Sequence, residues 1–143
     1  MPNGPLPEQW HSSTVHTMAD MKGVIDRLVD QMTAGGFAEK DLFSMRLAVE
    51  EAVVNAIKHG NAGDPAKSVQ VNFQVSPSQV LVDVEDQGPG FDPDAVPDPL
   101  APENLERPSG RGLFLIRYYM TWVRFNERGN RLTMCKEKTA AAT

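Results

Sequence analysis

The chain has 143 residues, of which 41% are hydrophobic and 23% are charged, so it is long enough for one globular domain with an ordinary core. Its net charge of −5 argues against direct nucleic-acid binding, because such binding needs a basic surface facing the phosphates. The single cysteine, Cys135, excludes an internal disulfide, and no apolar run approaches the ~20 residues that span a bilayer. With no signal-like start, we expect a cytoplasmic protein whose partners are small molecules or proteins, not membranes.

The N-terminal half predicts a tail, an edge strand and two helices. Residues 1–9 hold three prolines and a glycine, a composition typical of a flexible tail. We expect a short edge strand within 11–17. In the helix predicted next, apolar residues recur every three or four positions up to a Gly-Gly stop: Met18, Met21, Ile25, Leu28, Val29 and Met32. A second helix, with a broad apolar face, is expected over 39–59 and ends at a glycine.

After Lys67 the apolar residues alternate with polar ones, which is the pattern of strands. Residues 69–75 and 80–86 form a predicted hairpin. Because side chains alternate between the two faces of a strand, Asp86 falls at the end of the apolar face of the second strand. A carboxylate placed there needs a partner.

The last third of the chain predicts a long loop, a helix and a second hairpin. Six of the eleven prolines lie between Pro89 and Pro108, which indicates a loop without regular structure. An apolar run over 113–120 predicts a helix with glycines at its start. The strands 122–126 and 131–136 are expected to form the closing hairpin, followed by a frayed tail over 138–143.

Glu51 and Asn55 are the first candidate functional pair. Four residues apart on a helix, they lie on one face with Cβ atoms roughly 6 Å apart. The amide oxygen of Asn55 suits Mg²⁺, while Glu51 can orient or deprotonate a nucleophile. Glu50 is the rival acid, but it points ~100° away around the helix. Lys58 is either a phosphate contact or an ordinary surface lysine.

Asp86, Gly88 and Gly90 form a second candidate group. An aspartate at the sheet edge can accept the exocyclic amine of adenine, and glycines let the backbone approach a flat ligand. The alternative is a tight turn after a strand.

A third candidate group, for phosphates, lies at the start of the third predicted helix. Gly110, Arg111 and Gly112 would offer backbone N–H groups there, and Arg107 and Arg111 add positive charge. The sequence holds no P-loop motif, so any ATP site belongs to another fold.

These three groups, in this order, resemble the boxes of the GHKL ATPases over Trp10 to Lys136. The segment Asn55-Ala-Ile-Lys-His-Gly60 is most similar to the anti-sigma-factor serine/threonine kinases. The resemblance implies an α+β two-layer sandwich, in which a mixed, mostly antiparallel sheet carries three helices on one face. It also implies an ATP-binding domain over 10–137, with an ATP lid at about 91–109.

The resemblance further implies roles for single residues. Glu51 would be the general base, Asn55 the Mg²⁺ ligand and Asp86 the adenine reader. The other expected nucleotide contacts are Lys58, Gly88, Gly90, Arg107, Gly110, Arg111 and Gly112. Many members open the last strand with Gly-Thr, whereas this chain has Gly129-Asn130, and Asn130 is left out of the predicted site.

The implied activity is transfer of the γ-phosphoryl group of MgATP to a serine or threonine of an anti-anti-sigma (STAS-type) protein. The same protein would bind a sigma factor and form a homodimer, to which Phe43 or the first helix could contribute. Two alternatives stay open: a non-catalytic, ATP-dependent binding switch, and the ATPase domain of a histidine kinase. The second is disfavoured because no dimerising helical hairpin with a phosphorylatable histidine precedes the domain.

Overall fold

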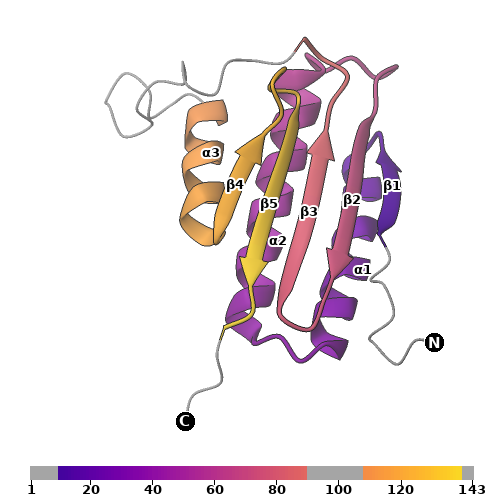
Figure 1. Ribbon diagram of the computed structural model, residues 1–143. Coiled ribbons are helices and arrows are strands. Elements are labelled where there is room, and N and C mark those ends of the chain that lie inside the picture. The colour runs from indigo at the N-terminus through magenta and orange to yellow at the C-terminus, as the bar shows by residue number, and fades with distance from the viewer. Residues whose placement is uncertain (1–9, 90–107, 140–143) are drawn as a thin grey trace, which may run out of the picture.

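In the computed structural model, residues 10–89 and 108–139 are described, with the side chains of 108–111 left aside. Within these residues, five strands form one sheet in the order β1-β2-β3-β5-β4, and helices α1 and α2 cover one of its faces (Figure 1). The strands are β1 (His11–Val15), β2 (Val69–Val75), β3 (Gln79–Glu85), β4 (Trp122–Phe125) and β5 (Arg131–Glu137). The helices are α1 (Met18–Ala34), α2 (Glu39–Asn55), a π-helix η1 (Ala56–Gly60) and α3 (Pro108–Tyr119).

The predicted α+β sandwich is confirmed, and every described pair of neighbouring strands is antiparallel. The edge strand, the first helix and both hairpins lie within a few residues of their predicted positions. None of the described helices is long and apolar enough to cross a membrane.

Two helix predictions need correction at their ends. The helix predicted over 39–59 changes at Ala56 into a π-helix, in which Asn61 N–H donates to the carbonyl of Ala56 at 2.8 Å. A π turn holds an extra residue, so it widens the end of the helix. The third helix begins at Pro108, so its glycines lie inside the helix and the last two residues of the expected lid are helical.

The core lies between α1, α2 and the covered face of the sheet. Alternate residues of the three inner strands β2, β3 and β5 point into it, since Phe73 pairs with Val82 and Val82 pairs with Met134 across the sheet. All three side chains are at most 1% exposed. Alternation therefore leaves the other side chains of these strands on the opposite face.

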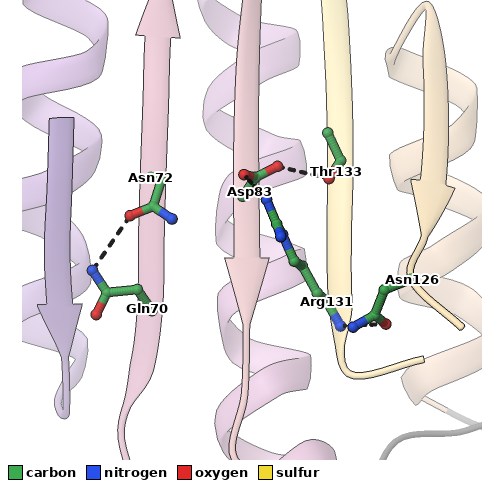
Figure 2. Close-up of polar contacts among 6 residues, drawn as sticks. All are labelled: Gln70, Asn72, Asp83, Asn126, Arg131 and Thr133. Atoms are coloured by element: carbon green, nitrogen blue, oxygen red, sulfur yellow. Dashed lines mark hydrogen bonds and ion pairs between the residues drawn. The ribbon is translucent and has the colours of Figure 1, made fainter. Parts of the chain in front are cut away.

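That opposite face is polar and carries its own bonds (Figure 2). Asp83, only 4% exposed, pairs with Arg131 at 2.7 Å and accepts a hydrogen bond from Thr133 Oγ1 at 2.6 Å. The hydrogen bond and the charge of the Asp83 carboxylate raise the pKa of Arg131. Nearer the edge, Gln70 Nε2 donates to Asn72 Oδ1 at 3.3 Å.

The start of α1 is fixed by a reciprocal cap. Thr17 Oγ1 accepts from the Asp20 N–H at 3.1 Å, and the Asp20 carboxylate accepts from the N–H groups of Thr17 and His16. These backbone donors favour the ionised carboxylate and lower the pKa of Asp20.

The start of α2 is tied to the end of β5 by a buried carboxylate. Asp41 is fully buried and accepts hydrogen bonds from Thr139 N–H at 2.9 Å and Thr139 Oγ1 at 2.6 Å. Lys136 Nζ lies 3.9 Å from the same carboxylate, and Lys138 Nζ donates to the carbonyl of Gly35. The frayed tail was predicted from 138, but Lys138 and Thr139 are held; 140–143 lie outside the described residues.

Replacing Asp41 with Ala should lower the free energy of unfolding by about 2–3 kcal/mol, because two hydrogen bonds to a buried carboxylate are lost and Lys136 loses its counter-ion. Urea denaturation followed by circular dichroism measures the change. The exposed Asp30 of α1 gives the control, since Asp30→Ala should change stability by less than ~0.5 kcal/mol. Equal effects of the two substitutions would contradict this role of Asp41.

Candidate functional site

Asp86 lies where the end of β3 meets the end of the α2–η1 helix. It is the first residue after β3, and its half-buried carboxylate accepts a hydrogen bond from the Gly88 N–H at 2.8 Å. A Cβ built on Gly60 would overlap this carboxylate. The last residue of η1 therefore has to be glycine for Asp86 to keep this position.

Gly88 is held even more tightly against the same helix end. A Cβ built on Gly88 would overlap the carbonyl oxygen of Gly60. Because that neighbour is backbone, it cannot turn aside as a side chain would. Two glycines far apart in sequence thus allow two backbone segments to touch beside Asp86.

Burial raises the pKa of Asp86, and this effect exceeds the opposite effect of the hydrogen bond from Gly88. The nearby charge of Glu85 raises the pKa further, while Arg128 and Lys67 lower it. Among the described residues, this half-buried carboxylate has one donor, the Gly88 N–H, so it keeps acceptor capacity for a ligand N–H group.

Two buried amides flank Asp86, and the sequence prediction left both out. Asn130 Nδ2 donates to the carbonyl oxygen of Asp86 at 3.1 Å, and Asp86 N–H donates to the carbonyl of Asn130 at 2.9 Å. On the other side, Asn61 Oδ1 accepts from the Gln87 N–H at 2.7 Å. Only the position of Asn61 after the helix stop and of Asn130 after Gly129 could have signalled them.

Glu51 and Asn55 meet at Gly112 of α3. A Cβ built on Gly112 would overlap Asn55 Nδ2 and lie 3.1 Å from Glu51 Oε2. Both polar side chains are half-buried, whereas Glu50 is exposed. The structure thus brings three of the predicted residues together: the carboxylate, the amide and the glycine.

The remaining predicted site residues divide into three groups. Lys58 is exposed on η1 and makes no ion pair with the described residues. The backbone of Gly110 and Arg111 lies in the first turn of α3, where N–H groups have no partner within the helix. Gly90, Arg107 and the lid segment 91–107 lie outside the described residues.

The amide oxygen of Asn55 and the carboxylate of Glu51 suit Mg²⁺ only when the ion arrives bound to a phosphate ligand. No group of three or more His, Cys, Asp or Glu side chains able to hold a metal occurs within 10–89 and 112–139. Mg²⁺ usually takes one or two protein oxygens, with phosphate and water oxygens for the rest. One amide oxygen beside one carboxylate, next to a helix start, fits that mode.

Comparison with known proteins identifies the family of the domain that carries these residues. The model of the histidine kinase-like ATPase domain matches residues 15–136. The chain belongs to this family. The match covers the end of the α2–η1 helix, the start of α3, Asp86 and the β4–β5 hairpin. The described part of the site therefore lies wholly within it.

Among curated relatives, the chain is similar to the serine-protein kinase RsbW of several bacteria. It is 32% identical to that of Staphylococcus epidermidis over 109 residues, which is 71% of this chain and 69% of the relative. It is 30% identical to that of Halalkalibacterium halodurans over 121 residues, 80% of this chain and 74% of the relative.

Replacing Gly112 with Ala should weaken ATP binding about tenfold, because the new methyl group displaces the Asn55 side chain. Isothermal titration calorimetry with ATP and Mg²⁺ measures the affinity. Gly23 of α1 gives a matched control, since a Cβ there would meet only Arg27 at 3.9 Å. Gly23→Ala should leave ATP affinity unchanged. If Gly112→Ala also left ATP affinity unchanged, the proposed contact between Gly112 and Asn55 would be refuted.

Replacing Asp86 with Asn should abolish ATP binding and yet stabilise the free protein at neutral pH. The pKa of Asp86 is higher in the folded than in the unfolded chain, so the ionised carboxylate costs stability above the folded pKa. The advantage of Asp86→Asn should shrink as the pH falls through the folded pKa toward the ordinary value of 3.8. Thermal unfolding against pH tests this.

Asp83→Asn is the control with the opposite sign, because it removes the ionic partner of Arg131 and should destabilise the protein at neutral pH. An Asp86→Asn variant that is less stable than the wild type at neutral pH would overturn the argument.

Proposed function

We propose that this chain is an ATP-dependent serine/threonine protein kinase of the anti-sigma-factor type. The observation that carries the proposal is the convergence of Glu51, Asn55 and Gly112 in a histidine kinase-like ATPase domain. Similarity to proteins named serine-protein kinase RsbW supports phosphoryl transfer to a protein hydroxyl.

ATP would lie with its base at Asp86 and its phosphates toward α3. The Asp86 carboxylate would accept the exocyclic amine of adenine, beside the close backbone contact of Gly60 and Gly88. The phosphates would face the first N–H groups of α3, where the helix dipole favours negative charge. The other proposed contacts to the nucleotide are made by Lys58, Gly88, Gly90, Arg107, Gly110 and Arg111.

Mg²⁺, held by Asn55, would neutralise charge on the phosphates when bound. The partner's serine or threonine oxygen would attack the γ-phosphorus, and its proton would pass to the Glu51 carboxylate. The bond between the γ-phosphorus and the bridging oxygen breaks, and ADP leaves. Glu51 suits this role better than Glu50, because Glu51 is half-buried beside Asn55 and Glu50 is exposed.

The proposed partners are an anti-anti-sigma (STAS-type) protein, which receives the phosphoryl group, and a sigma factor, which this chain would sequester in the cytoplasm. The homodimer stays a prediction. Phe43, one of the residues expected to contribute, is 60% exposed, and its ring lies 5.9 Å from that of Tyr119.

Glu51→Gln should leave ATP affinity unchanged and lower phosphoryl transfer about 100-fold or more, because the proton loses its acceptor. Transfer is measured with radiolabelled ATP on purified STAS-domain proteins from the same cell, and ATP affinity by calorimetry. Glu50→Gln, which changes an exposed carboxylate on the same helix, serves as the control and should transfer at the normal rate.

Normal transfer by Glu51→Gln would exclude Glu51 as the base. A wild-type protein that binds ATP and transfers phosphate to no STAS protein would instead favour the non-catalytic switch, in which ATP only changes affinity for a protein partner.

A further inference from the structure

The turn that holds Asp86 is bonded on both sides by asparagine side chains from two other parts of the chain. Asn61 follows η1, while Asn126 and Asn130 belong to the β4–β5 hairpin. We refer to Asn61, Asn126 and Asn130 as the amide clamp. Asp86 and the glycines around it do not by themselves explain why three amides gather here.

The hairpin side of the clamp is a chain of two bonds. Asn126 Nδ2 donates to Asn130 Oδ1 at 2.8 Å, which fixes the orientation of the Asn130 amide. Asn130 Nδ2 then donates to the carbonyl oxygen of Asp86 at 3.1 Å. Asn130 is 9% exposed, so water competes little for these groups.

Asn126 is itself held by the hairpin turn. Its Oδ1 accepts from the N–H groups of Gly129, Asn130 and Arg131 at 2.8, 3.1 and 3.2 Å. Figure 2 shows the bond between Asn126 and Arg131, the first residue of β5. One side-chain oxygen thus organises the turn, while the nitrogen of the same amide reaches toward the site.

The other side of the clamp fixes the residue after Asp86. Asn61, 1% exposed, accepts from the Gln87 N–H and donates through Nδ2 to the carbonyl of Ser68 at 2.9 Å. The Gln87 side chain closes the loop, because its Oε1 accepts from the Ser68 N–H at 2.6 Å. The backbone is therefore held at Asp86 and at Gln87 from opposite sides.

We propose that Asn130, oriented by Asn126, is a positioning residue for nucleotide binding, which sets the direction of the Asp86 carboxylate by holding the backbone carbonyl of Asp86. Asn61 holds the following peptide from the other side. This inference rests on the proposed ATP site. Asn130 itself need not touch the nucleotide, since its amide nitrogen is already used by the backbone of Asp86.

Two variants test the hairpin side. Asn130→Ala removes the bond to Asp86 and should weaken ATP binding about tenfold. Asn126→Asp keeps the oxygen that organises the turn, but replaces the donor to Asn130 with a second oxygen, so it should weaken ATP binding about threefold. Asn126 is exposed, so the added charge stays in water and the variant should fold.

Asn72→Asp is the matched control for the added charge. Asn72 lies on the open face of the sheet, where its Oδ1 accepts from Gln70, and an aspartate keeps that acceptor. Its ATP affinity should equal that of the wild type. All affinities are measured by calorimetry with ATP and Mg²⁺ at a temperature at which thermal unfolding shows each variant to be folded.

A second readout needs no nucleotide. Hydrogen exchange by NMR reports the Gly88 N–H, which donates to the Asp86 carboxylate, and its exchange should quicken in Asn130→Ala and in Asn126→Asp but not in Asn72→Asp. Wild-type ATP affinity and exchange in both hairpin variants would overturn the positioning role and leave the proposed kinase intact. A wild-type protein that binds no ATP would overturn both.

Discussion

The site depends on a contact between two backbones, where the end of the helix at Gly60 touches the turn at Gly88. No side chain fits between them, and the Asp86 carboxylate fills the remaining space. The approach is possible because α2 is packed across the sheet by a continuous apolar face, which fixes where its last turn ends. A helix shifted by one residue would move Gly60 away and leave a larger side chain against Asp86.

A single helix carries both ends of the proposed nucleotide site. Glu51 and Asn55 lie at the last turns of α2, and η1 continues to Gly60 beside Asp86. The π-helix widens this end of the helix, a feature that is frequent at functional sites. At the other end of α2, the buried Asp41 ties the helix to the chain after β5, so the helix is anchored at both ends.

Asp83, within β3, and Asp86, directly after β3, are two carboxylates close in sequence that lie in very different surroundings. Asp83 is buried, forms an ion pair with Arg131 and accepts a hydrogen bond from the Thr133 hydroxyl, so its role is structural. Asp86 is half-buried, its carboxylate has one donor within the described part of the chain, and burial raises its pKa. An acid that is held in place but incompletely bonded costs stability and keeps capacity for a ligand, which is the usual condition of a binding site.

The elements and the spacing of Glu51 and Asn55 were predictable from the sequence, because periods of two and of 3.6 residues are local and identify the buried side of a strand or helix. The sequence also placed Asp86 on the apolar side of its strand. The π-helix and the amide clamp were not predictable from the sequence. The bonds from Asn61 to Gln87 and from Asn130 to Asp86 join residues 26 and 44 positions apart, so they depend on how distant segments return to one another. No local pattern encodes such a meeting.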